Sequence, residues 1–283
     1  MWLDAYLERI GYGGPVAPTL DCLKSVHRAH ALSVPYENLD IQLGRPVWCD
    51  IDRIVEKIVT RRRGGWCYEM NTLLAHGLMA IGFDVRLVTG GIHRFERGDA
   101  ALGNHILALV DLDRTYVADL GLGDGLREPV PLAEGSYAQG TLGFQLSRLA
   151  DGFWRFTNHA GAYPVSFDFS ESPVDPAAIE ARNRELQTSP DSVFVQNLII
   201  QRMRADTLVC LTGRVFQEKS ASDSRKKMVW DAAEMEALVS AKFGIDDPEI
   251  ASVWPRVEAR HRALFGDRDV ADLAVSTFGR PTV

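Results

Sequence analysis

The chain of 283 residues predicts an α+β fold, because its hydrophobic periodicity changes twice along the sequence. In the first part, residues 1–84, apolar residues recur at helical spacing. In the middle part, residues 85–188, short β-rich runs are bounded by Gly, Asp and Asn, a pattern typical of an antiparallel barrel or sandwich. The last part, residues 189–283, mixes both patterns. We therefore expect a helical bundle, a β domain and an α/β domain, in that order.

The helices of the first part are predicted from apolar faces separated by proline-bearing connectors. These faces are formed by Leu20, Leu23, Val26 and His27, then by Ile51, Ile54, Val55, Ile58 and Val59, and then by Met70, Leu73, Leu74, Leu78 and Ile81. Gly82 ends the third helix, as glycine commonly does at a helix C-terminus.

Five β-rich runs predict the strands of the middle part: Val85–Thr89, His105–Val110, Tyr116–Leu120, Phe153–Thr157 and Val165–Phe169. In the last part, strands are predicted over Val193–Ile200, Thr207–Phe216 and Met228–Trp230, and the polar run Gln217–Lys227 is interpreted as a solvated hairpin loop. A helix over Ala232–Phe243 should end at Gly244, and a further helix should follow Pro248, kinked or restarted at Pro255.

The composition excludes several classes of protein. Hydrophobic residues make up 46% and charged residues 24%, so the chain is neither mainly disordered nor fibrous. The formal net charge of −7 argues against a global attraction to nucleic acid or anionic lipid. The longest aliphatic stretch, Ile106–Val110, is far shorter than the about 20 residues of a membrane-spanning helix, and the N-terminus lacks a secretory pattern. We expect a cytoplasmic protein without a membrane or nucleic-acid partner.

The cysteines and histidines give no metal pattern. Cys22, Cys49, Cys67 and Cys210 form no C-x-x-C pair, so we expect free thiols. No histidine stands at a diagnostic spacing from another metal-type ligand, so no metal site is predicted. The segment 121–125, with Gly at 121, 123 and 125, resembles a phosphate-binding loop. Because it lacks the strand and helix that flank such a loop in a dinucleotide-binding fold, it is interpreted as a tight turn.

Cys67 is the first candidate for chemistry, because it follows Gly64 and Gly65 and opens the third helix. The unpaired backbone N–H groups and the positive end of the helix dipole favour a thiolate there, and nearby arginines add positive charge. The same N–H groups are placed to stabilise an oxyanion. The alternative is a buried structural cysteine whose glycines only permit a tight turn.

A thiolate nucleophile needs a proton acceptor, and the acceptor needs an orienting group. His105 opens a strongly patterned strand, and Asp119 is a carboxylate inside the next apolar strand, where burial is costly unless the charge is paired. The two side chains share one face of a hairpin if the numbers of opposed residues sum to an even value, which leaves the three-residue loop 112–114 or a bulge. A two-residue turn would place them on opposite faces. The alternatives are a core histidine and an aspartate paired with an arginine.

Several segments together resemble the arylamine N-acetyltransferase family. They are Arg63-Gly64-Gly65-Trp66-Cys67-Tyr68-Glu69-Met70-Asn71, the strand His105–Val110, the segment Val117–Gly123, the early motif Val34-Pro35-Tyr36-Glu37-Asn38-Leu39 and the later Ser189-Pro190-Asp191-Ser192-Val193-Phe194. The likeness implies a papain-like cysteine-protease-type fold with a helical N-terminal bundle, a central antiparallel β-barrel and a C-terminal α/β lid.

The resemblance also implies an activity and a set of site residues. Acetyl-coenzyme A would acetylate Cys67, and an arylamine, arylhydrazine or arylhydroxylamine would then take the acetyl group, with no permanently bound cofactor. His105 would be the proton partner and Asp119 the orienting carboxylate. The likeness further implies supporting roles for Arg63, Glu37, Gly65 and Trp66, an acceptor pocket walled by Tyr36 and Leu122, and coenzyme A contacts at Gly121 and Gly123. The sequence differs from the family at Tyr36 and Leu122, where phenylalanine is frequent.

Three other interpretations remain open at this stage. An amide synthase that closes a macrolactam from a carrier-bound chain would use the same triad with another acyl donor. A papain-like peptidase or a transglutaminase would also need a cysteine, a histidine and an acid. A binding module would keep Cys67 as a structural residue, slow towards iodoacetamide.

Overall fold

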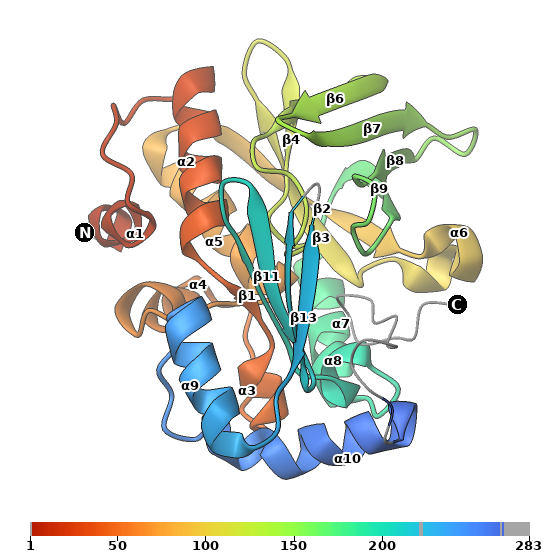
Figure 1. Ribbon diagram of the computed structural model, residues 1–283. Coiled ribbons are helices and arrows are strands. Elements are labelled where there is room, and N and C mark those ends of the chain that lie inside the picture. The colour runs from red at the N-terminus through yellow and green to blue at the C-terminus, as the bar shows by residue number, and fades with distance from the viewer. Residues whose placement is uncertain (1, 221–222, 267, 269–283) are drawn as a thin grey trace.

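The structure is a computed structural model, which describes residues 2–220, 223–266 and 268. It confirms the α+β fold: helices surround a five-stranded and an eight-stranded antiparallel sheet, and the eight-stranded sheet forms a nearly closed barrel (Figure 1). In its described part, none of the helices is long and apolar enough to cross a membrane.

The N-terminal helices pack around one buried helix that carries Cys67 at its start. They are α1 (Trp2–Ile10), α2 (Leu20–Ser33), α3 (Leu39–Gln42), α4 (Ile51–Val55), continued by a π-helical turn at Glu56–Thr60, and α5 (Cys67–Ile81). Helix α5 buries almost its whole length, and its apolar residues join those of α1 and α2 in one core. Gly77 lets Tyr6 lie close, since a Cβ there would be 2.6 Å from the Tyr6 ring. Gly82, with φ +108°, ends α5 as predicted.

The barrel follows α5 and carries the other two predicted site residues. Its strands are β2 (Asp84–Ile92), β3 (His105–Asp111), β4 (Thr115–Ala118), β5 (Val130–Pro131), β6 (Gly135–Gln139), β7 (Leu142–Arg148), β8 (Trp154–Thr157) and β9 (Ser166–Pro173). Their order in the sheet is β5-β4-β3-β2-β9-β8-β7-β6. Strands β6 and β7 were not among the predicted runs, because they are rich in Gly, Ser and Gln and expose alternate residues. A core of Phe and Leu side chains fills the interior.

The five-stranded sheet joins the N-terminal and C-terminal parts of the chain. It contains β1 (Tyr36–Glu37), β10 (Ile199–Met203), β11 (Thr207–Thr212), β12 (Val215–Ser220) and β13 (Ser224–Met228), in that order. One face packs against α9 (Ala232–Phe243) and α10 (Trp254–Phe265) through Ile200, Val209, Leu211, Phe216, Met235, Val239 and Phe243. Helices α7 (Pro176–Thr188) and α8 (Val193–Gln196) connect the barrel to this sheet.

Three predictions in the last part are wrong. The predicted strand Thr207–Phe216 is two strands, β11 and the start of β12, which turn at residues 213–214 and pair with each other. The polar run Gln217–Lys227 is not a loop, because its ends belong to strands β12 and β13, which pair from Val215 opposite Met228 onward. The polar side chains of these two strands are partly buried in β12 and mostly exposed in β13, so their sequence resembles a loop. The predicted strand Val193–Ile200 begins as helix α8, which the Ser192 hydroxyl caps by accepting from the Phe194 N–H at 3.3 Å. The restart at Pro255 is confirmed, since this residue lies in the first turn of α10.

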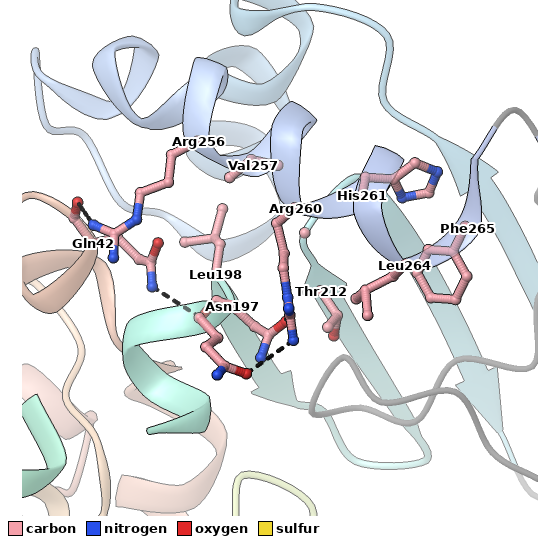
Figure 2. Close-up of a pocket in the computed structure, with 12 residues that line it drawn as sticks. Gln42, Asn197, Leu198, Thr212, Arg256, Val257, Arg260, His261, Leu264 and Phe265 are labelled. Atoms are coloured by element: carbon pink, nitrogen blue, oxygen red, sulfur yellow. Dashed lines mark hydrogen bonds between the residues drawn. The ribbon is translucent and has the colours of Figure 1, made fainter. Parts of the chain in front are cut away.

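Helix α10 is attached by arginines to the segment that precedes β10. Arg260 Nε donates to Asn197 Oδ1 at 3.2 Å, and Arg256 Nη1 donates to the Gln42 carbonyl at 3.3 Å (Figure 2). Gln42 in turn donates from Nε2 to the Asn197 carbonyl at 3.1 Å. Because these bonds join α10, α3 and the start of β10, they hold the five-stranded sheet against the N-terminal part.

Candidate active site

The structure brings Cys67, His105 and Asp119 together from three segments. Cys67 is the first residue of α5, His105 is the first residue of β3, and Asp119 directly follows β4. All three side chains are buried, with His105 fully inaccessible. The site therefore lies where the helix N-terminus meets the barrel hairpin.

The hairpin has the register that the sequence analysis required. Ala108 pairs with Ala118 and Asp111 with Thr115, so opposed residue numbers sum to an even value and the three residues 112–114 form the loop. His105 and Asp119 consequently lie on the same face of the barrel wall. The His105 Nε2 to Asp119 Oδ2 distance of 2.9 Å shows that they are hydrogen-bonded.

Asp119 is held as a carboxylate by several donors. Besides His105, the Asn71 side chain and the Gly121 backbone N–H each donate to its Oδ1 at 2.8 Å. Burial alone raises the pKa of Asp119, but the His105 charge and these hydrogen bonds outweigh it and leave the pKa below its usual value. An ionised Asp119 accepts the Nε2 proton of His105, so Nδ1 of a neutral ring carries the lone pair.

Cys67 and His105 are neighbours across Gly121. A Cβ on Gly121 would lie 2.7 Å from both Cys67 Cβ and His105 Cε1, so these two atoms are at most twice that distance apart. Within the described residues, His105 Nδ1 has no hydrogen-bond partner, so the thiol and the imidazole are close without a hydrogen bond between them. Catalytic hydrogen bonds in enzymes without bound substrate are often long and tighten in the substrate complex.

Burial controls the ionisation of Cys67. It raises the pKa of the thiol well above its usual value, and the Asp119 charge raises it further. Backbone N–H groups of Tyr68 and Cys67 lower the pKa, as expected at a helix N-terminus, but by less than burial raises it. The helix start alone therefore does not produce a thiolate here, and ionisation requires a proton acceptor such as His105.

Asn71 is a site residue to which the sequence analysis assigned no role. It lies one helical turn after Cys67 on the same face of α5. Its Nδ2 donates to Asp119 and, at 2.6 Å, to the Ile106 carbonyl, and its Oδ1 accepts from the Leu120 N–H at 2.8 Å. Asn71 thus ties the helix to both barrel segments. The spacing of four residues from Cys67, which places both side chains on one helix face, is the signal that would have indicated it.

The predicted ion pair between Arg63 and Glu37 is present and belongs to a larger buried cluster. Arg63 Nη2 lies 2.9 Å from Glu37 and its Nη1 2.6 Å from Asp247. Lys57 lies 2.9 Å from Glu69 and 3.0 Å from Asp40. Together with Arg45, which pairs with Asp247 and Asp40, three cations face four carboxylates: Lys57, Arg63, Arg45, Glu37, Asp40, Glu69 and Asp247. Of these, the sequence analysis identified only Arg63 and Glu37.

Gly64 and Gly65 let the segment before Cys67 lie against the strand that carries Tyr36. A Cβ on Gly64 would be 2.1 Å from the Pro35 carbonyl oxygen, and one on Gly65 would be 2.8 Å from Glu69 Cβ. Gly65 N–H donates to the Pro35 carbonyl at 3.2 Å, and the Glu37 N–H donates to the Gly65 carbonyl at 3.0 Å. The two motifs are therefore joined by a short β-bridge.

The remaining predicted residues are buried around this centre. Trp66 is fully inaccessible and packs edge-on against Phe194, with ring centroids 4.9 Å apart. Tyr36 lies in the same apolar cluster as Cys67, whereas Leu122 belongs to the barrel core. The space beside Gly121 is filled by Cys67, His105 and Asn71, and that beside Gly123 by Gln201. Side chains of the protein therefore pack closely against both Gly121 and Gly123.

A second polar group follows in the same loop. Asp124 accepts from His159 Nε2 at 3.0 Å and from Lys219 Nζ at 2.6 Å, which joins the loop to the barrel and to β12. These residues line a cavity of about 720 Å³ between the barrel and the five-stranded sheet. In the described part of the chain, no group of three or more His, Cys, Asp or Glu side chains is placed to hold a metal ion.

The chain is similar to known N-acetyltransferases, and its most similar relatives include members of one family. A family model described as N-acetyltransferase matches residues 19–249. The pineal gland isozyme of arylamine N-acetyltransferase from Gallus gallus is 30% identical over 273 residues, covering 87% of this chain and 94% of that protein. The Mycolicibacterium smegmatis arylamine N-acetyltransferase is 32% identical over 261 residues, covering 89% and 94%. The chain belongs to the arylamine N-acetyltransferase family, whose members are acyltransferases.

Solved structures agree with this assignment. The arylamine N-acetyltransferase of M. tuberculosis superposes with a TM-score of 0.82 at 28% identity, covering 90% of this chain and 99% of that one. The Mycobacterium marinum enzyme in complex with CoA gives a TM-score of 0.80 at 28% identity, covering 91% and 97%. The predicted α+β fold of this family is thereby confirmed.

Proposed function

We propose that this chain transfers the acetyl group of acetyl-coenzyme A to an arylamine or arylhydrazine, or to the oxygen of an arylhydroxylamine, through a thioester on Cys67. The observation that carries the proposal is the position of His105, which is hydrogen-bonded to Asp119 and lies next to Cys67 at the start of α5. This arrangement occurs in a chain that belongs to the arylamine N-acetyltransferase family. The CoA complex of the M. marinum relative supports CoA as the acyl carrier. No permanently bound cofactor is proposed.

In the first half-reaction, His105 Nδ1 takes the proton of the Cys67 thiol. The sulfur then attacks the thioester carbonyl carbon, the carbonyl oxygen becomes an oxyanion, and the bond to the coenzyme A sulfur breaks. His105 returns the proton to the departing thiolate, which leaves as coenzyme A. The backbone N–H groups of Cys67 and Tyr68 at the helix start are the proposed oxyanion donors, each contributing about 2.7–4 kcal/mol in hydrolase precedents.

In the second half-reaction, the acceptor amine attacks the acetyl carbon of the thioester. The nitrogen loses a proton to His105, the bond to Cys67 Sγ breaks, and the thiol is regenerated. Arylamines are largely neutral near pH 7 and so already nucleophilic. Asp119 remains ionised throughout, because its role is to orient the ring and stabilise the imidazolium. Burial of the site limits the access of water, which would otherwise hydrolyse the thioester.

An amide synthase would use the same triad with a carrier-bound acyl chain. The relatives and structures reported above are named arylamine N-acetyltransferases, which favours acetyl-coenzyme A as donor. The predicted domain boundaries and the predicted cytoplasmic location stay predictions.

The proposal is tested by incubating the protein with acetyl-coenzyme A and locating the acetyl group by peptide mass spectrometry. We expect one acetyl group on Cys67, lost in Cys67→Ala. Cys49→Ala is the matched control, because Cys49 is a half-buried thiol near the same cluster and should leave the adduct unchanged. Acetyl groups found only on lysines would exclude the mechanism.

A further inference from the structure

The cavity between the barrel and the five-stranded sheet has the size of a ligand site. Its volume of about 720 Å³ is within the range of about 300–1,000 Å³ that is typical of small-molecule sites. Loops of the barrel line it with Asp124, Arg127 and His159, and strand β12 lines it with Lys219. None of the triad residues is among the described residues that line it. The cavity is therefore separate from the surroundings of the nucleophile.

Arg127 places a buried guanidinium in the wall of this cavity. The residue is only 6% exposed, and burial lowers the pKa of its guanidinium although the Asp124 charge opposes the shift. Its Nη1 donates to the Gly125 carbonyl at 2.5 Å, and its Nη2 lies 3.6 Å from Asp124 Oδ1. Within the described residues, its Nε has no hydrogen-bond acceptor. A buried donor without an acceptor is costly, so a ligand that accepts from Nε would stabilise this arrangement.

The backbone of Arg127 is held in place from two directions. Its N–H donates to Gln139 Oε1 at 2.7 Å, and its carbonyl oxygen lies 3.1 Å from His27 Nδ1. These contacts attach the residue to strand β6 and helix α2. A donor that is fixed before the ligand arrives loses little conformational entropy on binding.

The charges in the buried part of the cavity do not balance. The Arg127 guanidinium and the Lys219 ammonium face one carboxylate, Asp124, whose Oδ2 lies 2.6 Å from Lys219 Nζ. In the more exposed part, Arg28 pairs with Glu128 at 3.5 Å. The buried part therefore holds at least one positive charge in excess, which favours an anionic ligand.

The available donors suit a phosphate group better than a carboxylate. The end of the Arg127 fork already faces Gly125 and Asp124, so a carboxylate cannot form its usual pair of parallel bonds there. Single donors from separate elements remain within the described residues. They are Arg127 Nε and one N–H of Lys219, which otherwise contacts Asp124 and, at 3.1 Å, the Gly161 carbonyl. A phosphate monoester offers three strong acceptor oxygens in different directions.

The rest of the lining suits a polar ligand. Hydroxyl groups line the cavity on Thr141, Thr207 and Ser224. Small-molecule sites usually combine a few placed polar groups with a larger apolar surface, whereas this cavity is polar on several sides. A phosphate on a polar body, such as a sugar, therefore fits the lining better than an aromatic phosphate.

We propose that this cavity is a second ligand site of the enzyme, separate from the Cys67 centre, and that it binds a small polar phosphate monoester through Arg127 and Lys219. The test is isothermal titration calorimetry of the full chain with ribose 5-phosphate at constant ionic strength. Ribose is the matched ligand without the phosphate. We expect ribose 5-phosphate to bind at least about tenfold more tightly than ribose, because hydrogen bonds to charged groups are the strong ones. Equal affinities, or no binding of ribose 5-phosphate, overturn the proposal.

Lys219→Met should weaken the binding of ribose 5-phosphate about tenfold, because it removes a charged donor and leaves Asp124 facing the phosphate. Lys227→Met is the matched control on the neighbouring strand β13. It removes the same charge from a side chain that pairs with Glu234 on α9, and it should bind with wild-type affinity. An equal loss in the two variants would exclude the cavity as the site.

Asp124→Asn should have the opposite effect. The change removes the negative charge that competes with the phosphate for Arg127 and Lys219, so binding should become tighter. A merely structural role of the ion pair would not give opposite signs for its two partners. Weaker binding in a folded Asp124→Asn variant would contradict the proposal. Urea unfolding midpoints show which variants are folded, and if Lys219→Met is not, Asp124→Asn and the comparison with ribose decide.

Coenzyme A also carries a phosphate monoester, so competition distinguishes the two sources of this group. Ribose 5-phosphate should bind with unchanged affinity at saturating coenzyme A and in Cys67→Ala. Displacement by coenzyme A would mean that its own phosphate occupies the cavity, and the claim of a separate site would fail. Calorimetry does not depend on acetyl transfer. Failure of this proposal is therefore distinguishable from failure of the proposed function, which is measured by acetylation of Cys67.

Discussion

Two buried polar clusters meet the first turn of α5, and they use their hydrogen-bonding capacity differently. Cys67 and Asn71 belong to the cluster with His105 and Asp119. In this cluster, Asn71 and His105 each make one hydrogen bond to Asp119, and within the described residues His105 Nδ1 has no hydrogen-bond partner. Glu69, on another side of the helix, belongs to the cluster of Lys57, Arg63, Arg45 and four carboxylates, where Lys57 and Arg63 each contact three acids.

This difference separates the cluster that takes part in the reaction from the cluster that holds the catalytic segment in place. The first cluster leaves a lone pair free next to a thiol, so it can accept and return a proton. The second cluster is saturated with ion pairs that join the segments 37–45 and 57–69 to Asp247, so it fixes the segment before Cys67. Substitutions should therefore affect activity in the first cluster and stability in the second.

Asp119→Asn should have the largest effect on activity. An amide can donate to His105 Nε2, which moves the ring proton to Nδ1 and removes the base for Cys67. We expect kcat to fall by about 10⁴, the loss caused by the equivalent change in a serine protease triad. Steady-state kinetics with acetyl-coenzyme A measure the loss, and a urea unfolding midpoint shows whether the variant is folded. Near-normal turnover in a folded variant would remove Asp119 from the mechanism.

Lys57→Met should have the largest effect on stability. Removing the cation leaves Glu69 and Asp40 buried without their shortest ion pair, and breaking a buried pair in this way costs about 3–5 kcal/mol. Urea denaturation measures the free energy of unfolding. Lys227→Met is the matched control, because the Lys227 pair with Glu234 is exposed and worth at most about 1 kcal/mol. Equal losses in the two variants would contradict the comparison.

Asn71→Leu should show an intermediate effect on both properties. The change removes three hydrogen bonds and leaves the Ile106 carbonyl and Leu120 N–H unpaired, at a cost of about 1–3 kcal/mol. Loss of the donor to Asp119 lets the hairpin shift against α5, and small displacements of catalytic groups reduce rates by up to about 10²-fold. A positioning role requires that kcat falls while KM for acetyl-coenzyme A stays constant. A change confined to KM would contradict it.

The sequence predicted the first cluster better than the second, for a physical reason. The pairing of His105 with Asp119 follows from the period of two in a strand and from the length of one loop, both of which are local. The saturated cluster includes Asp247, which lies 184 residues from its partner Arg63, and no local pattern indicates that contact. The placement of Cys67 beside His105 was likewise indicated by the resemblance to a family rather than by periodicity.

Polar sequence misled the fold prediction in the last two strands of the five-stranded sheet. The Gln, Glu and Lys side chains of β12 are only partly buried, and the Arg and Lys side chains of the edge strand β13 are mostly exposed, so the hydrophobic pattern of a strand is weak there. The approach of Gln201 to Gly123 was missed for another reason. Gln201 and its neighbour Arg202 are both polar residues of β10, and only the coordinates reveal that the Gln201 side chain lies against Gly123.

Glu69→Gln should have the smallest effect at neutral pH and shows most clearly how the second cluster works. Burial and the neighbouring Glu37 and Asp40 charges raise the pKa of Glu69 to about 7, although Lys57 opposes the shift. Because this pKa lies above the value of 4.5 for an unperturbed glutamate, the contribution of Glu69 to stability is fully present below about pH 4.5. It is lost as the pH rises through about 7.

Glutamine resembles the protonated acid and does not titrate, so the difference in unfolding free energy between wild type and Glu69→Gln isolates this group. From about pH 5 to about pH 8, wild type should lose stability relative to the variant. The glutamine oxygen still accepts from the Trp66 N–H, so kcat should change little. Urea denaturation across this pH range measures the difference. If the unfolding free energies of wild type and Glu69→Gln change in parallel with pH, Glu69 stays ionised over this range. The cluster would then hold four ionised carboxylates, which would contradict the prediction.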